Sequence, residues 1–228
     1  MNCVARWLSA FWAIIWRSGL FIVLWGMLLA PAIIPLAERH RAGEPDNPPW
    51  MLYSDAVSAL TVLAAAWLMV RLVDRRPFTS LGFAPGHLIR DLLLGATIGA
   101  GWLTLSIAML WLAGWITPQS SHRISWFSLV CTAVALVFNA LCQEVLTRSY
   151  IFQTIQSRTN APVAILSSSV LFSAFHAGAF QGAWLLPAVN LFIAGVLFGT
   201  AYCLSGNLWL PIAIHFTWNL LLGPAAIP

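Results

Sequence analysis

The sequence contains no Lys and few charged residues of any kind. Charged side chains make up 8% of the 228 residues, whereas soluble domains average about 25%. A soluble protein of this length needs many charges to cover its surface, so this composition excludes a water-soluble fold. Apolar residues make up 60% of the chain and the mean hydropathy is +0.83. The chain is therefore expected to be an integral membrane protein.

Disulfides and nucleic-acid binding are also disfavoured. The four cysteines show no Cys-x-x-Cys pair and no other metal-binding spacing, so they are expected to pack as small hydrophobic side chains. The net charge of +4 comes from 11 Arg, which lie singly or in short clusters between apolar runs. That distribution favours a membrane-orientation signal over a nucleic-acid partner.

Apolar runs of about 18 residues or more are long enough to span a bilayer. Seven such runs predict an all-α fold, a polytopic transmembrane helical bundle of about seven to eight spans. The first run is expected to be a retained anchor and not a cleaved signal peptide. Residues 1–120 are expected to form N-terminal transmembrane helices, and residues 121–228 a core that carries most of the unusual polar residues. The runs are approximately 19–37, 55–73, 91–117, 125–147, 161–178, 184–204 and 208–226.

The arginines predict an orientation. With the alternating spans above and Arg148 left out, seven Arg fall on the side of the N-terminus and three on the other. The positive-inside rule then places the N-terminus in the cytoplasm. The expected location is a bacterial inner membrane. With seven spans the C-terminus would face outward, and an eighth, shorter helix would reverse that.

One carboxylate stands out in the second half of the chain. Six of the seven acids, Asp55 among them, are expected in loops or at span ends, and Glu144 is the single acid after Asp91. Glu144 and Arg148 are four residues apart, so they can pair on one helix face. An apolar pair would be cheaper to insert into a membrane, which indicates a functional reason for the charges.

Other polar residues suited to catalysis lie in the later apolar runs. Phe172 and His176 share one helix face, and His215 and Asn219 share another. A lone His in a helix is more often a packing residue, but this set comes from separate helices. If those helices pack together, one cavity would gather a carboxylate, two imidazoles, an amide and a guanidinium. These groups suffice for water activation and an oxyanion site.

Three motifs occur in a fixed order: Gln143-Glu144-Val-Leu-Thr-Arg148, Phe172-Ser-Ala-Phe-His176 and His215-Phe-Thr-Trp-Asn219. They resemble the CPBP family of intramembrane proteases, also called the Abi or CAAX-protease-like family. Its motifs are Glu-Glu-x-x-x-Arg, Phe-x-x-x-His and His-x-x-x-Asn or Asp. Each motif alone is weak, whereas their order, spacing and location in apolar runs form a specific signal. The resemblance covers about residues 130–225.

The resemblance implies an intramembrane endopeptidase that cleaves a membrane-associated or lipid-modified protein. Its expected partners are a membrane-embedded or lipidated substrate and the lipid bilayer. Glu144 would deprotonate a water that His176 also holds, and His215 with Asn219 would stabilise the oxyanion of the tetrahedral intermediate. Arg148 would favour the charged form of Glu144. The family favours chemistry without a cofactor. The alternative is a zinc ion held by Glu144, His176 and His215, although zinc proteases usually supply both His from one helix.

Gln143 departs from the family pattern, which has Glu at this position as the general base. An amide cannot accept a proton at useful pH. Three explanations stay open: Glu144 has become the base, Glu was replaced by near-isosteric Gln through engineering, or the chain has lost proteolysis. In the last case it would act as a membrane binding, immunity or secretion-support protein. A small transporter is less favoured, because the sequence shows no repeated halves.

Overall fold

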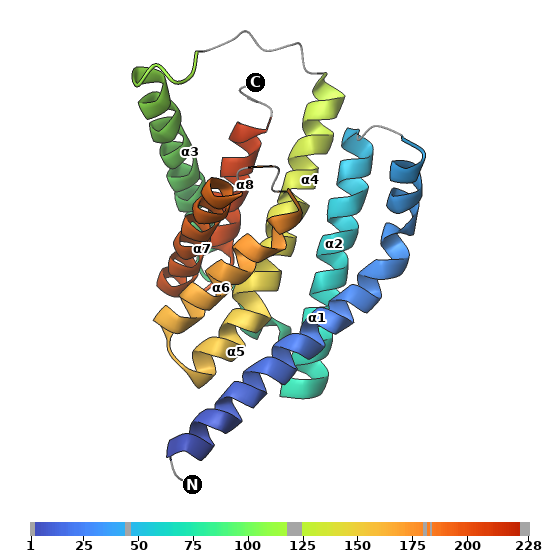
Figure 1. The fold of residues 1–228 in the computed structure, drawn as a ribbon, viewed down its shortest axis with the longest axis vertical. Coiled ribbons are helices and arrows are strands. Elements are labelled where there is room, and N and C mark those ends of the chain that lie inside the picture. The colour runs from blue at the N-terminus through green and yellow to red at the C-terminus, as the bar shows by residue number, and fades with distance from the viewer. Residues whose placement is uncertain (1–2, 44–46, 118–124, 180–181, 183, 224–228) are drawn as a thin grey trace.

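The computed structural model describes residues 3–43, 47–117, 125–179, 182 and 184–223. All regular elements within these ranges are helical (Figure 1), which confirms the predicted all-α bundle. Two short 3₁₀ turns, Phe78–Leu81 and Ala177–Ala179, lie between helices. The helices are α1 (Cys3–Arg41), α2 (Pro48–Leu68), α3 (Leu88–Leu112), α4 (Trp126–Glu144), α5 (Ile151–Arg158), α6 (Ala161–Phe175), α7 (Leu185–Ser205) and α8 (Trp209–Leu222).

Two wider π-helical turns extend the regular helices. The first, Met69–Asp74, continues α2, and the second, Val145–Tyr150, joins α4 to α5 in one continuous helical stretch. The described residues thus form seven continuous stretches, each overlapping one predicted apolar run, and no separate eighth stretch occurs among them. Five are long and apolar enough to cross a membrane, whereas α6 and α8 are shorter.

Three predicted spans were too short. The first, 19–37, lies inside a helix of 39 residues that continues through Pro31 and Pro35. The second, 55–73, begins earlier, at Pro48, and the fourth, 125–147, continues to Arg158. Hydropathy missed these extensions because it follows apolar content, and helical hydrogen bonding continues into the polar ends of these segments.

Side-chain caps explain where several helices begin. The Oδ1 atom of Asn47 accepts a hydrogen bond from the backbone N–H of Trp50 at the start of α2. Asn160 caps α6 through Val163 in the same way. Such caps satisfy backbone donors that the first turn of a helix leaves free. They fix the residue at which each of these two helices begins.

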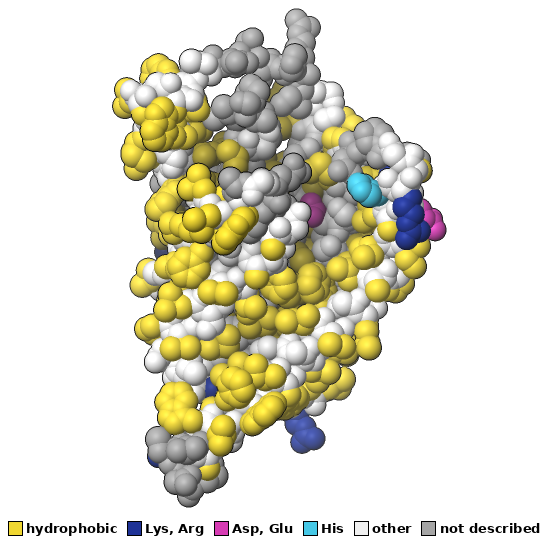
Figure 2. Space-filling model, in the orientation of Figure 1, with side chains coloured by type: hydrophobic (Ala, Val, Ile, Leu, Met, Phe, Trp, Pro, Cys, Tyr) yellow, Lys and Arg dark blue, Asp and Glu magenta, His cyan; other side chains and the backbone are white. Residues whose placement is uncertain are grey.

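The outer surface is apolar. Figure 2 shows hydrophobic side chains over most of one face, with charged groups few and near the ends. The exposed large side chains include Trp7, Trp12, Leu93 and Leu186. A water-soluble protein does not expose apolar patches of this extent. This surface and the long apolar helices show an integral membrane protein.

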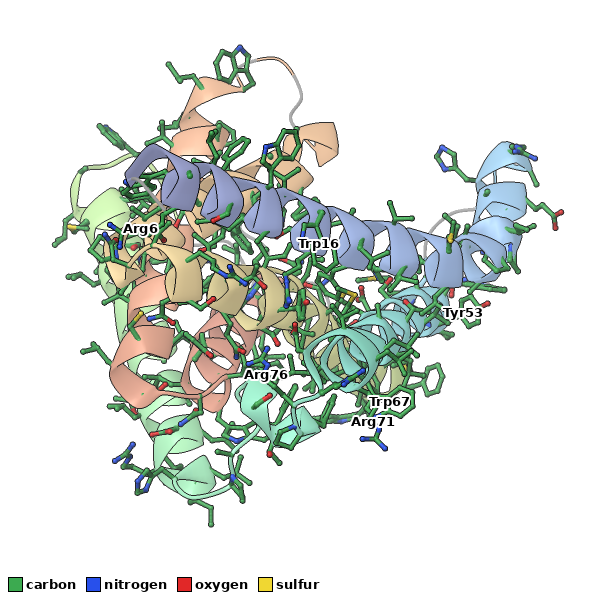
Figure 3. The ribbon with its side chains drawn as sticks, turned by 90° about the horizontal axis from the view of Figure 1, so that it is seen from below. Arg6, Trp16, Tyr53, Trp67, Arg71 and Arg76 are labelled. Carbon is green, nitrogen blue, oxygen red and sulfur yellow. The ribbon has the colours of Figure 1, made fainter. Side chains whose placement is uncertain are left out.

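One end of the bundle carries a cluster of ion pairs. Both Arg17 of α1 and Arg76 pair with Asp74 at the end of the first π turn. Arg76 also donates to the Oε1 atom of Gln153 of α5, at 3.2 Å. Figure 3 views the bundle from this end, the end at which α1 begins, and labels Arg6, Arg71 and Arg76. Helix α8 ends at the opposite end (Figure 1).

Close helix contacts require glycine at two places. A Cβ atom at Gly95 of α3 would lie 2.5 Å from the Cβ atom of Ala213 of α8, and one at Gly195 of α7 would lie 2.8 Å from the Cα atom of Ser169 of α6. Small residues let helix backbones approach in membranes, where dispersion and hydrogen bonding drive association. These contacts hold α8 and α7 in the positions from which they supply the polar residues discussed below.

The Gly95 contact predicts a stability effect. Gly95→Ala should lower the melting temperature in detergent, because overpacking typically costs about 1–3 kcal/mol. Gly101→Ala on the same helix is the matched control, since its Cβ would meet nothing within 4 Å. Ala is also the better helix former. Equal melting temperatures for the two variants would contradict the close packing of α3 on α8.

Candidate active site

The second π turn buries a charged pair at the centre of the bundle. Glu144 and Arg148 are both fully buried, and the Nη1 atom of Arg148 lies 3.5 Å from the Oε1 atom of Glu144. This confirms the ion pair predicted from the i, i+4 spacing. The pair sits where α4 widens, and π turns of this kind occur frequently at functional sites.

Arg148 is held from several sides. Its guanidinium lies 4.5 Å from the ring centroid of Phe172 and 5.3 Å from that of Phe198. Its Nη2 atom donates to the carbonyl oxygen of Gly195, at 3.1 Å. Cation–π contacts strengthen when they are desolvated, as here. The guanidinium therefore connects the α4–α5 stretch to α6 and α7.

Glu144 orients the imidazole of His215. The Nδ1 atom of His215 lies 2.9 Å from the Oε1 atom of Glu144. An ionised carboxylate only accepts hydrogen bonds, so Nδ1 carries the proton and donates it to Glu144. The other ring nitrogen, Nε2, is then left for a ligand. The ring also stacks on Phe198, with centroids 4.8 Å apart, which fixes its plane.

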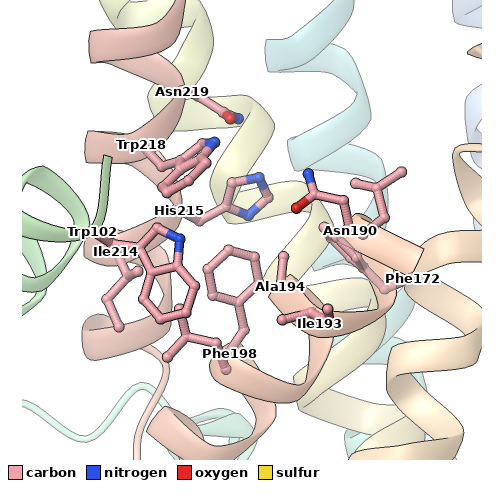
Figure 4. A pocket seen from close by; sticks show the side chains of 12 residues that line it. Trp102, Phe172, Asn190, Ile193, Ala194, Phe198, Ile214, His215, Trp218 and Asn219 are labelled. Carbon is pink, nitrogen blue, oxygen red and sulfur yellow. The ribbon is translucent and has the colours of Figure 1, made fainter. Parts of the chain in front are cut away.

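A cavity of about 90 Å³ adjoins His215 (Figure 4). Its polar lining comes from His215 and Asn219 of α8 and from Asn190 of α7, and the rest is aromatic or aliphatic. In Figure 4 the side chain of Asn190 lies beside the imidazole, and that of Asn219 lies further along α8. We call this space the His215 cavity. Amide and imidazole N–H groups that converge in this way can bind a developing oxyanion.

His176 lines a second cavity, of about 340 Å³, which we call the His176 cavity. Its other polar side chains include Gln143 and Asn139 of α4 and Asp55 of α2. The Nδ1 atom of His176 lies 2.7 Å from the carbonyl oxygen of Phe172. Because a carbonyl oxygen only accepts, Nδ1 carries the proton and Nε2 is an acceptor.

The sequence predicted one shared cavity, and the structure divides the residues between two. His215 and Asn219 line one cavity, while Gln143 and His176 line the other. Both imidazoles contact the Phe172 ring, with centroids 5.8 Å away for His215 and 4.7 Å for His176. Phe172 lines both cavities and is their common wall.

Glu144 lines neither of these two cavities, although direct contact with the attacking water was expected of it. Its Oε1 atom faces His215, and its buried Oε2 atom has no hydrogen-bond partner among the described residues. The zinc alternative assigned Glu144, His176 and His215 to one metal ion. Within the described ranges, no three His, Cys, Asp or Glu side chains lie close enough together to hold a metal.

The sequence analysis did not identify two of the polar residues that line these cavities, Asp55 and Asn190. Asp55 was placed at a span end, whereas it lies inside α2 and lines the His176 cavity together with Ser58. The sequence feature that could have identified this face is the i, i+3 spacing of two polar residues, Asp55 and Ser58, in an otherwise apolar helix. Asn190 was overlooked, although it is the one amide within the apolar run 184–204. Neither residue belongs to the three motifs.

Comparison with known proteins gives one match. Residues 124–221 match a family model described as Type II CAAX prenyl endopeptidase Rce1-like. Searches of curated proteins and of solved structures found no match. The matched region contains all three motifs, the whole α4–α5 stretch and most of α8. Residues 124–221 are therefore similar to the Rce1-like endopeptidases, which agrees with the resemblance to the CPBP family that the three motifs indicate.

Proposed function

We propose that this protein is an intramembrane endopeptidase that hydrolyses a peptide bond in a membrane-associated or lipid-modified protein. The observation that carries the proposal is the 2.9 Å contact between the buried Glu144 carboxylate and His215, which faces a cavity shared with Asn219. A buried carboxylate that orients a His at a cavity wall is a common catalytic arrangement.

His215 and Asn219 would stabilise the oxyanion. Glu144 orients the ring through Nδ1, so that Nε2 would donate into the cavity when the ring carries both protons, and the Asn219 amide would supply a second donor. Loss of one such donor typically costs about 10²–10³ in rate. In this scheme Glu144 acts through His215, as a positioning residue, and it does not contact the attacking water.

His176 would act on the water. Its Nε2 atom is an acceptor because Nδ1 is bonded to the Phe172 carbonyl, so it can orient a water in the His176 cavity. Arg148 pairs with Glu144 and contacts the Phe172 ring between the two cavities. For one scissile bond to meet both sides, the Phe172 ring would turn aside so that the two cavities join, with the carbonyl oxygen toward His215 and the water toward His176.

The substrate and the setting follow from the surroundings. The walls of the His215 cavity are largely aromatic and aliphatic, which suits a lipidated or membrane-embedded chain. The arginine-rich end, where α1 begins, would face the cytoplasm by the positive-inside rule. A bacterial inner membrane is the proposed location.

A second candidate is a family member without proteolytic activity that binds a membrane partner. It is favoured by Gln143, because an amide stands where the family has its base. In this case the His176 cavity would hold a ligand without cleaving it. The experiments below separate the two candidates.

The first prediction concerns His215. His215→Ala should lower cleavage by about 10²–10³-fold, because the oxyanion loses a donor. The measurement uses protein in liposomes and a quenched fluorescent farnesylated peptide with a C-terminal Cys-aliphatic-aliphatic-X sequence. His87→Ala, at an exposed position before α3, is the control and should retain the full rate. Normal turnover by His215→Ala would reject the proposed oxyanion site.

The second prediction separates the structural and chemical roles of Glu144. Glu144→Gln leaves Arg148 as an unpaired buried cation, which typically destabilises a protein by about 3–5 kcal/mol. The double variant Glu144→Gln/Arg148→Met removes both charges and should recover most of the melting temperature. It should not recover cleavage, because His215 still lacks its carboxylate. Recovery of both would mean that Glu144 serves only to neutralise Arg148.

The third prediction concerns a metal. Catalysis by the protein's own side chains should survive 1,10-phenanthroline and extensive dialysis against EDTA. Elemental analysis of the purified protein provides a readout that does not depend on activity. One zinc per chain, lost in His215→Ala, would support the zinc alternative instead.

A further inference from the structure

Asp55 is half-buried, and its partners differ from those of Asp74 and Asp91. Asp74 pairs with Arg17 and Arg76, and Asp91 pairs with Arg90. Asp55 lies inside α2 and lines the His176 cavity, and no ion pair to it occurs among the described residues. An ionisable residue within a membrane helix is costly and marks a functional site by default.

A chain of hydrogen bonds connects Asp55 to the position of the missing base. The Nδ2 atom of Asn139 donates to Oδ1 of Asp55 at 3.1 Å, and Nε2 of Gln143 donates to Oδ1 of Asn139 at 2.9 Å. The carboxylate sets the direction of this chain, because it can only accept. Asn139 must present its NH₂ group to Asp55 and its oxygen to Gln143.

This direction determines what Gln143 offers. Its NH₂ group is used by Asn139, so its Oε1 atom points away from the chain. That atom is buried and has no partner among the described residues. A buried acceptor without a partner is unusual and is typically satisfied by water. Gln143 therefore supplies no proton acceptor at the position where the family has its Glu.

The alternative is a purely structural link between α2 and α4. Such a link could use neutral side chains and would need no cavity beside it. Here the link ends in a carboxylate, and it borders a cavity of about 340 Å³ that also contains His176. Since no described residue donates to the Oδ2 atom of Asp55, this oxygen remains available to a water.

We propose that Asp55 is the general base of this protein, in place of the Glu that the family has at position 143. This inference rests on the proposed function. His176 holds the water in the His176 cavity, and Asp55, which lines the same cavity, takes one of its protons. The remaining hydroxide oxygen bonds to the carbonyl carbon, and the C=O π pair moves to the oxygen that His215 and Asn219 stabilise. When the C–N bond breaks, its electron pair stays on nitrogen, which receives the proton from Asp55.

The test compares Asp55→Asn, Gln143→Glu and the double variant in liposomes with the farnesylated peptide. Asp55→Asn should lower kcat by about 10²–10⁴-fold, the usual contribution of a general base. In the double variant, Glu at position 143 supplies a new carboxylate. Its kcat should be at least tenfold higher than that of Asp55→Asn. Glu38→Gln, an equivalent change at an exposed site at the end of α1, should have no effect. Melting temperatures verify folding.

The outcomes distinguish a failure of Asp55 as the general base from a failure of the proposed protease function. If Asp55→Asn is fully active while His215→Ala is inactive, the protein is a protease and Asp55 is not its base. If the unaltered chain is inactive while Gln143→Glu cleaves, the scaffold is competent and Asp55 does not substitute for the lost Glu. If a folded Gln143→Glu variant and the unaltered chain are both inactive, the proposed function and the role of Asp55 fail together. If Asp55→Asn loses cleavage activity and melts at a lower temperature, and the double variant does not recover cleavage, the hydrogen-bond chain has a structural role only.

Discussion

The position of the Glu144 carboxylate between Arg148 and His215 determines the rest of the site. A buried anion must be neutralised, and the nearest cation is a guanidinium one turn further along the same helix. That guanidinium is in turn fixed by the rings of Phe172 and Phe198. Because these groups come from α4, the second π turn, α6, α7 and α8, one charge fixes the mutual arrangement of the helices that carry the three motifs.

In the proposed mechanism the two cavities, one on each side of Phe172, have different roles. The cavity lined by His215, Asn219 and Asn190 would bind the oxyanion. The cavity lined by Asp55 and His176 would bind the attacking water. The same ring contacts both imidazoles and the guanidinium, so the wall between the two sides is held by the charge network itself. The N-terminal helices are then more than a membrane anchor, because α2 contributes a carboxylate to the His176 cavity.

The sequence predicted the bundle and the residues of the motifs, because apolar length and polar residues within apolar runs are local signals. The Glu144–Arg148 pair followed from helical spacing alone. The split into two cavities could not be predicted, because it depends on where the Phe172 ring lies between packed helices. Asp55 was missed for a related reason: hydropathy placed the start of its span too late, and the cap at Asn47 begins α2 before Asp55. Which face of α2 meets α4 is a property of tertiary packing.

The wide turn at Val145–Tyr150 also constrains how this chain can change in evolution. Such a turn arises when a helix accommodates one extra residue. Removing that residue would return the segment to regular α geometry, and the residues after it would keep nearly their present orientation relative to α4. Removing a residue from the regular part of α4 would instead rotate everything after it by about 100°. Gln153 would then swing away from Tyr202, whose hydroxyl it contacts at 2.8 Å. A single-residue deletion just after Arg148 should therefore disturb the packing of α5 less than the same deletion within the regular turns of α4.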